Sequence, residues 1–224
     1  MRKIAVLCDF DGTIARDDVG NLLFSTFSQN GNSKKVVDQW RRGEISSRQC
    51  LEQEAALVEV DPCSLNKFIR DRQIDPYFKD FHDFARKRDI EVVVVSDGLD
   101  YYIEQILVRF GLGGIEFFAN RLAFKNGGFE VEFPWHDLME CTDCGCCKTH
   151  HLYRYRESGH FIVYVGDGLS DRCPCEEADM VFAKGDLLNH CRKKQIDHIE
   201  FRNFRDVERE VLQRIVLDDA FAGE

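Results

Sequence analysis

Hydrophobic residues in this chain occur either in short unbroken runs or at helical spacing. Residues 4–8, 161–165 and 180–183 form unbroken apolar runs, and residues 90–95 form a run interrupted only by Glu91; such runs are typical of strands buried on both faces of a parallel sheet. Residues 115–119 predict one further strand, and segments with apolar residues every three or four positions separate the runs. Strands that alternate with helices predict an α/β fold with a Rossmann-like doubly wound parallel sheet.

One long stretch departs from this alternation. Residues 15–75 show helical patterns and no convincing strand. Ser46 and Gln49 have the spacing of a capping box, and Asp61 followed by a proline is typical of a helix start. We therefore predict a helical cap at residues 15–75, inserted into a catalytic core made of residues 1–14 and 76–224.

A β-hairpin is predicted after the strand at residues 115–119. Residues 121–125 and 129–133 both favour strands, and Asn126-Gly127-Gly128 between them supplies the residue types that tight hairpin turns need. The predicted fold class is therefore α/β, with a doubly wound parallel sheet, an inserted helical cap and a hairpin.

Length and charge narrow the class of protein. A chain of 224 residues can bury a substantial core, and its formal charge of −10 without a basic stripe argues against a nucleic-acid or membrane partner. No apolar run reaches the length of a membrane span, and Met1-Arg2-Lys3 leads directly into the first strand, so we expect no signal peptide and a cytoplasmic location. The expected partner is a small molecule, and a homodimer is left open.

Polar residues follow three of the buried runs. Asp9 and Asp11 follow the first, Ser96-Asp97-Gly98 follows the second, and Asp167 and Asp171 follow the run at residues 161–165. The carboxyl ends of parallel strands meet at one edge of a sheet, where ligands bind in open α/β folds. Several carboxylates in one crevice are costly unless a cation is held there, and hard oxygen ligands suit Mg²⁺. A solvated turn would explain Asp9 and Asp11 by themselves. It does not explain why polar residues follow all three strands in this order.

With Lys148 ahead of the last acidic motif, the chain resembles the haloacid dehalogenase (HAD) superfamily of aspartyl-phosphate phosphatases. The helical insert directly after the first motif resembles the subgroup with a C1-type cap. The resemblance implies a Mg²⁺-dependent phosphoric monoester hydrolase in which Asp9 is the nucleophile. It also implies that Asp11 is the general acid and then the base, and that Lys148 neutralises Asp9 and the phosphate.

The resemblance also implies binding roles around these residues. Thr13 would orient the surroundings of Asp11, and Ser96 would bind a phosphate oxygen. Asp9, Asp167 and the backbone carbonyl of Asp11 would bind Mg²⁺, with Asp171 supporting them. The implied phosphate- or substrate-binding residues are Thr13, Ser96, Asp97 and Gly98, and the implied magnesium site comprises Asp9, Asp11, Asp167 and Asp171.

Within the superfamily, the string Cys144-Gly145-Cys146-Cys147-Lys148 is similar to the 2-hydroxy-3-keto-5-methylthiopentenyl-1-phosphate phosphatases of methionine salvage. That group carries Ser-Gly-Gly in the second motif and Gly-Asp-Ser in the fourth, whereas this chain has Ser-Asp-Gly and Gly-Asp-Gly. Phosphoserine, phosphocholine and phosphoethanolamine phosphatases therefore stay open. A non-enzymatic alternative also stays open, in which the chain is a catalytically silent binding module with the same fold.

Two charged residues of the predicted cap are candidates for substrate binding. Asp18 lies where phosphoserine phosphatases place an acid that meets the substrate amine, but it also suits the N-terminus of a helix. Arg48 is a candidate for the rest of the substrate, with a solvated helix position as the alternative.

Cysteines cluster just before Lys148. Ten cysteines occur in the chain, and Cys141, Cys144, Cys146 and Cys147 fall within seven residues. Four thiols on a tight loop can hold a structural Zn²⁺, and buried thiols or a redox switch are the alternatives. In each case we expect the cluster to hold the loop that carries Lys148.

Overall fold

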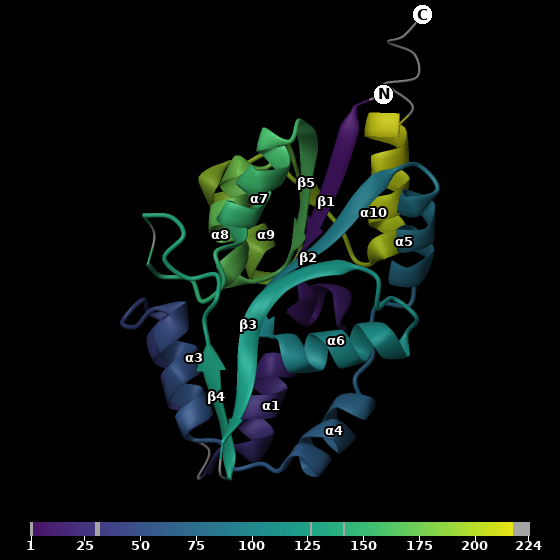
Figure 1. Ribbon diagram of the computed structural model, residues 1–224. Helices are drawn as coiled ribbons and strands as arrows, with labels where there is room; N and C mark the ends of the chain where they lie inside the picture. Colours follow the sequence, from purple (N-terminus) through teal and green to yellow (C-terminus); the bar gives the residue numbers. More distant parts are fainter. Residues whose placement is uncertain (1, 30–31, 126, 141, 217–224) are drawn as a thin grey trace, which may run out of the picture.

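A single seven-stranded sheet organises the computed structural model, which describes residues 2–29, 32–125, 127–140 and 142–216 (Figure 1). The strand order is β4-β3-β2-β1-β5-β6-β7, and every pairing is parallel except β3 with β4. The predicted α/β fold with a mainly parallel sheet is thus confirmed. The strands are β1 (Lys3–Cys8), β2 (Ile90–Leu99), β3 (Glu116–Lys125), β4 (Gly128–Glu132), β5 (His160–Gly166), β6 (Met180–Ala183) and β7 (Ile199–Glu200).

Helices account for most of the remaining chain. In order they are α1 (Val19–Phe27), α2 (Ser33–Arg41), α3 (Ser47–Ala56), α4 (Pro62–Arg70), α5 (Phe78–Arg86), α6 (Asp100–Arg109), α7 (Lys148–Glu157), α8 (Arg172–Glu177), α9 (Gly185–Lys194) and α10 (Phe204–Val211). Within the described ranges, none of them is long and apolar enough to cross a bilayer.

Strand β1 is buried on both faces, which explains its unbroken apolar run. Val6 and Cys8 belong to a core cluster with residues of α5, α6 and α10, whereas Ala5 and Leu7 belong to a second cluster with residues of α7, α8 and α9. In Figure 1 the latter three helices lie on one side of the sheet, with α5 and α10 on the other. A strand covered twice has no solvent face, so its polar residues appear only where it ends.

Helices α1 to α4 come from the stretch predicted as a cap. In Figure 1, α1, α3 and α4 gather with β4 beyond the carboxyl end of β1. Phe24 of α1 packs on Phe129 of β4 with ring centroids 6.2 Å apart, and Phe27 packs on Phe68 of α4 at 5.6 Å. The hairpin thus joins the helices in covering this edge. The division of the chain into core and cap stays a prediction.

The region of the hairpin differs from the predicted pattern. Residues 115–119 and 121–125 were expected to form separate strands, but they form the single strand β3. Its first half pairs with β2, and after β2 ends its second half pairs with β4 (Lys125 with Gly128). Asn126 of the predicted turn lies outside the described residues. Strand β7 was not predicted, because a two-residue strand carries no periodicity that a sequence can show. Helix α10 was not predicted either, although Phe204, Val207 and Val211 follow helical spacing after the N-cap residue Asn203.

Candidate active site

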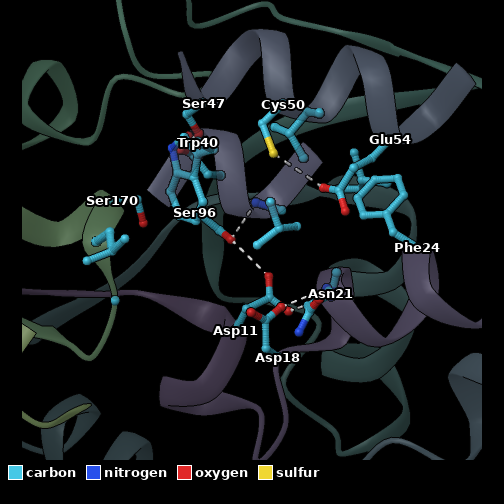
Figure 2. Close-up of a pocket in the computed structure, with 18 of the residues that line it drawn as sticks. Asp11, Asp18, Asn21, Phe24, Trp40, Ser47, Cys50, Glu54, Ser96 and Ser170 are labelled. Atoms are coloured by element: carbon cyan, nitrogen blue, oxygen red, sulfur yellow. Dashed lines mark hydrogen bonds between the residues drawn. The ribbon is translucent and has the colours of Figure 1, made fainter. Parts of the chain in front are cut away.

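The three acidic motifs meet at one edge of the sheet because their strands are neighbours. Strand β1 lies between β2 and β5, and Cys8 at its end pairs with Val94 and Val165. Asp9 continues this register, since its N–H donates to the carbonyl of Val165 at 2.9 Å. Figure 2 shows the pocket that results, with Asp11, Ser96 and Ser170 facing the same space.

Lys148 connects the first and last motifs. It begins α7 and is 2% exposed, and its Nζ donates to Asp9 Oδ1 and Asp171 Oδ1, both at 2.6 Å. Nζ also donates to Ser170 Oγ at 3.1 Å. Burial alone would lower the pKa of Lys148, but Asp171 and Asp9 raise it well above its usual value. The lysine therefore stays charged and holds the two carboxylates together.

Asp171 is a supporting group with no remaining acceptor capacity. Its Oδ1 accepts from Lys148 and, at 2.6 Å, from the hydroxyl of Tyr164, while its Oδ2 accepts the N–H groups of Asp167 and Gly168 at 2.9 Å each. A carboxylate offers about four acceptor sites, and all are used here. Asp171 therefore orients the loop that carries Asp167.

Three carboxylates form the group that could hold a metal ion. Oxygens of Asp9, Asp167 and Asp171 all lie within 4.8 Å of one another, and no other such set of acids, histidines and cysteines occurs within the described residues. Burial raises the pKa of Asp9 well above its usual value, and burial followed by Asp171 raises the pKa of Asp167 to about 6. Acids that raise one another's pKa gain most from a shared cation, so this donor set fits a hard divalent ion.

Thr13 and Gly12 shape the side of this cluster that belongs to the first motif. The Thr13 hydroxyl donates to Asp167 Oδ1 at 2.7 Å, across 154 residues of sequence. Gly12 has φ +72°, and a Cβ at this position would lie 2.5 Å from Asp167 Oδ2. Glycine is therefore required both for the left-handed turn and for the close approach of the two motifs.

Asp11 occupies a different environment from Asp9. Tyr102 donates its hydroxyl to Asp11 Oδ2 at 2.5 Å, and the N–H groups of Val19 and Gly20 at the start of α1 donate to Oδ1 at 2.9 and 3.3 Å. Burial and, next, the charge of Asp18 raise the pKa of Asp11 to about 7, although these hydrogen bonds oppose the change. A carboxyl with this pKa can both donate and accept a proton near neutrality.

The second motif contributes Ser96, Asp97 and Gly98 in three different ways. Ser96 Oγ accepts the N–H of Gly98 at 2.9 Å and donates to Asp11 Oδ2 at 3.5 Å. Gly98 lies so close to the Tyr102 hydroxyl and to Asp11 that a Cβ would overlap both. Any larger residue would displace the Tyr102 hydroxyl or the Asp11 carboxyl.

Asp97 joins three segments of the chain. Its Oδ2 accepts from the hydroxyl of Ser47 at the start of α3 (2.6 Å), and its Oδ1 accepts from the N–H of Cys146 (2.7 Å). The backbone N–H of Ser47 also donates to the carbonyl of Asp143 at 2.9 Å. Asp97 lines the pocket, but both its oxygens already hold the loop before Lys148 against a helix of the predicted cap.

The two charged candidates from residues 15–75 lie in different places. Asp18 lines the pocket and also accepts the N–H of Asn21 at 2.8 Å as the N-cap of α1, so the two expectations for it are compatible. Arg48 lies outside this pocket, where its Nε pairs with Glu52 at 2.9 Å and its guanidinium stacks over Phe133 at 5.3 Å.

The cysteine loop supports Lys148 through its backbone. Cys146 and Cys147 are buried, and Cys147 is the N-cap residue of α7. Burial raises the pKa of the Cys146 thiol well above its usual value, which disfavours the thiolate that zinc requires. Cys141 lies outside the described residues, and Cys144, Cys146 and Cys147 belong to no metal-binding group within the described chain. The structure gives the zinc hypothesis no support.

Three contributors were not foreseen from the sequence. Tyr102 fits the apolar spacing of its helix, and we interpreted it as core packing. Tyr164 lies in the predicted strand at residues 161–165, and nothing in the sequence singled out Glu54. All three are buried polar groups. The partners of the two tyrosine hydroxyls are remote in sequence, and Glu54 Oε1 has no partner among the described residues. The one signal in the sequence is a polar atom within an apolar pattern, and it marks only the tyrosines.

Comparisons with known proteins agree with this geometry. The chain is 29% identical over 220 residues to a "2-hydroxy-3-keto-5-methylthiopentenyl-1-phosphate phosphatase" of Brevibacillus brevis, with 96% of this chain and 97% of the relative covered. A protein of the same name from Bacillus pumilus is 30% identical over 210 residues, with 92% and 90% covered. A solved structure described as "Phospho-Aspartyl Intermediate Analogue of Phosphoserine phosphatase" superposes with a TM-score of 0.73 at 25% identity, covering 96% of this chain and all of that one.

The fold, the acid cluster and these likenesses define a phosphatase of the haloacid dehalogenase superfamily, a phosphoric monoester hydrolase. The chain belongs to the family described as "Putative Phosphatase", whose model matches residues 4–212.

Proposed function

We propose that this protein is a Mg²⁺-dependent phosphomonoesterase that acts on a small metabolite through a phosphorylated Asp9. The arrangement of Lys148 between Asp9 and Asp171 at the carboxyl edge of the sheet carries this proposal. A carboxylate that attacks a phosphate dianion meets like-charge repulsion, and the buried ammonium beside Asp9 opposes that repulsion. A covalent intermediate on Asp9 divides one difficult displacement into two easier ones.

The acids at the sheet edge are suited to hold magnesium. Asp9 and Asp167 would hold it together with the backbone carbonyl of Asp11, and Asp171, whose four acceptor sites are filled, would keep Asp167 in place. When bound, the ion supplies a second positive charge that stabilises the transferring phosphoryl group. Thr13 fixes one oxygen of Asp167 and leaves the other available.

We assign proton transfer to Asp11. In the first step its protonated carboxyl donates to the leaving alcohol oxygen, and in the second step its carboxylate accepts a proton from the attacking water. Tyr102 and the start of α1 fix the orientation of this carboxyl. Ser96 lines the pocket beside it and is the proposed ligand of a phosphate oxygen.

Three kinds of phosphorylated substrate are candidates. The names of the relatives given above point to 2-hydroxy-3-keto-5-methylthiopentenyl-1-phosphate as the substrate, and therefore to a role in methionine salvage. The matching solved structure nominates phosphoserine, and the amino-alcohol phosphates are the third kind. The choice depends on the helices that cover the pocket.

Hydrolysis of p-nitrophenyl phosphate, with added Mg²⁺ and with EDTA, tests the proposal. Asp9→Asn keeps the shape of the side chain but removes its nucleophilic carboxylate, so we expect at least about a 10³-fold loss of kcat. Asp197→Asn, the same change at an exposed site, serves as the control and should match the native rate. A native rate for Asp9→Asn, or a rate that EDTA leaves unchanged, would overturn the proposal.

The covalent step has its own test. Acid quenching during turnover should yield a phosphorylated peptide that contains Asp9, and mass spectrometry should find no such peptide from Asp9→Asn. A phosphoryl group on another residue would reassign the nucleophile.

A further inference from the structure

The carboxylate of Asp97 holds the chain just ahead of the buried lysine. Its Oδ1 accepts the backbone N–H of Cys146 at 2.7 Å, across 49 residues of sequence. Cys146 lies two residues before Lys148, the first residue of α7. Two residues span at most about 7 Å of chain, so a fixed Cys146 restricts where the helix and its lysine begin.

The loop before Lys148 makes further contacts with the same part of the sheet. Cys146 is buried, and its sulfur accepts a hydrogen bond from the backbone N–H of Ser96 at the end of β2. Gly145 lies against Asn120 of β3, since a Cβ at this glycine would be 2.9 Å from Asn120 Nδ2. Residues 145 and 146 therefore pack directly on β2 and β3.

Asp97 is itself fixed from within the sheet. The register of β2 with β3 shifts between Val95 and Leu99, and such an irregularity gives a side chain a new direction. At this point Asn120, which is fully buried, donates Nδ2 to the backbone carbonyl of Asp97 at 2.7 Å. The sheet therefore holds Asp97, and Asp97 holds the loop.

The group that this support serves is the ammonium of Lys148. Its Nζ contacts Asp9 and Asp171 at 2.6 Å each. A shift of α7 by about 1 Å would lengthen these contacts to a distance at which no hydrogen bond remains. Burial lowers the pKa of Lys148. Asp171 and Asp9 raise it most, and Asp97 is the third carboxylate that does so.

We propose that Asp97 is a positioning residue that places the ammonium of Lys148 through the backbone of Cys146. This inference rests on the proposed phosphomonoesterase function and adds a residue that acts on the reaction through the lysine. Both oxygens of Asp97 accept hydrogen bonds from the protein, the second one from the hydroxyl of Ser47 at 2.6 Å. Its contribution therefore needs no contact with the substrate and should be the same for every ester.

Two substitutions of Asp97 test this role. Asp97→Ala removes both acceptors, and we expect kcat on p-nitrophenyl phosphate and on propyl phosphate to fall by the same factor, about 30- to 100-fold. Asp97→Asn keeps an oxygen that can accept the N–H of Cys146, so its loss should be only about fivefold.

Asp61 provides a matched control. It also accepts a backbone N–H and a serine hydroxyl, at 2.8 and 2.6 Å, but it is exposed at the start of α4 and lies outside the pocket. Asp61→Ala should therefore keep the native kcat. A loss in Asp97→Ala that differs between the two esters would assign Asp97 to substrate binding and overturn the inference. Equal losses in Asp97→Ala and Asp97→Asn would overturn it too, because the charge and not the contact with Cys146 would then matter.

The route through Lys148 has a test of its own. In a Lys148→Met background no ammonium is left to place, so Asp97→Ala should lower kcat by less than about threefold. The full loss in both backgrounds would show that Asp97 acts independently of the lysine and would contradict the inference. If denaturation curves show that Asp97→Ala does not fold, Asp97→Asn replaces it, and its loss should vanish in the Lys148→Met background.

The native protein separates the two proposals. Absence of all phosphatase activity with Mg²⁺ would contradict the proposed function itself. Native activity together with a native kcat in Asp97→Ala would contradict the positioning role alone.

Discussion

The two ends of the pocket differ in how fully their polar groups are satisfied. At the sheet edge, Asp171 accepts four hydrogen bonds and Asp9 pairs with a buried lysine. At the opposite end, one carboxylate oxygen of Glu54 has no hydrogen-bond partner among the described residues, and aromatic side chains line the pocket beside it. Polar groups at the sheet edge are therefore satisfied within the protein, whereas Glu54 at the opposite end has an acceptor that the described residues leave open.

Under the proposed function, this difference would separate the residues that perform the reaction from those that select the substrate. Preorganised donors and charges at the sheet edge need no reorganisation during the reaction, which is where electrostatic catalysis is strongest. An unmet buried acceptor at the other end penalises every ligand that fails to satisfy it, which is how a site discriminates. Changes at the sheet edge should therefore reduce all activities, and changes at the other end should alter preference.

Removal of the lysine should have the largest effect. Lys148→Met leaves Asp9 and Asp171 buried without their cation, so we expect kcat to fall by about 10²- to 10³-fold on every ester. Steady-state kinetics on aryl and alkyl phosphates measures this loss, with the exposed Lys193→Met as the control. A loss confined to one substrate would show that Lys148 serves recognition, and circular dichroism shows whether the variant folds.

A methyl group at Gly98 should have the next largest effect. Gly98→Ala places a Cβ against the Tyr102 hydroxyl and Asp11, so we expect about a 100-fold fall in kcat through displacement of the proton-carrying carboxyl. Gly114→Ala, where a Cβ meets nothing within 4 Å, is the matched control. Near-native turnover by Gly98→Ala would mean that the position of Asp11 is not critical.

Loss of the hydrogen bond between α3 and the end of β2 should reduce activity less. Ser47→Ala removes the hydroxyl that donates to Asp97, and we expect kcat/KM to fall about fivefold, because one hydrogen bond to a charged group is lost. Ser25→Ala, exposed on α1, is the control. A double-mutant cycle with Asp97→Asn should give a coupling of about 1 kcal/mol, and strictly additive effects would exclude the interaction.

Glu54→Gln should change the free energy of unfolding in a pH-dependent way. Burial raises the folded-state pKa of Glu54 from 4.5 to about 7, so its ionisation opposes folding progressively as the pH rises between these values. Glu54→Gln should therefore be more stable than the native protein at pH 8, by about 3 kcal/mol, and the gain should fall below about 1 kcal/mol at pH 5. Chemical denaturation without ligand at several pH values measures it, and a gain independent of pH would contradict a strained carboxylate.

Much of the sheet edge could be predicted because local patterns determine it. An unbroken apolar run identifies a buried strand, and the residue after it must lie at the sheet edge, so Asp9, Ser96 and Asp167 were brought together by topology alone. The hairpin signal at Gly127-Gly128 was equally local. The division of residues 115–125 into two strands was wrong, because pairing with two different neighbours is not recorded in the pattern of one strand.

The sequence by itself thus determined the parallel sheet, the order of the acidic motifs and the need for a cation among them, since these follow from periodicity and from charge repulsion. Only the tertiary structure decided which groups orient those acids. Tyr102 reaches Asp11 across 91 residues, and an apolar-looking helix position does not reveal where its hydroxyl points. The open oxygen of Glu54 is also a property of packing, because a missing partner is defined only once every neighbour is in place.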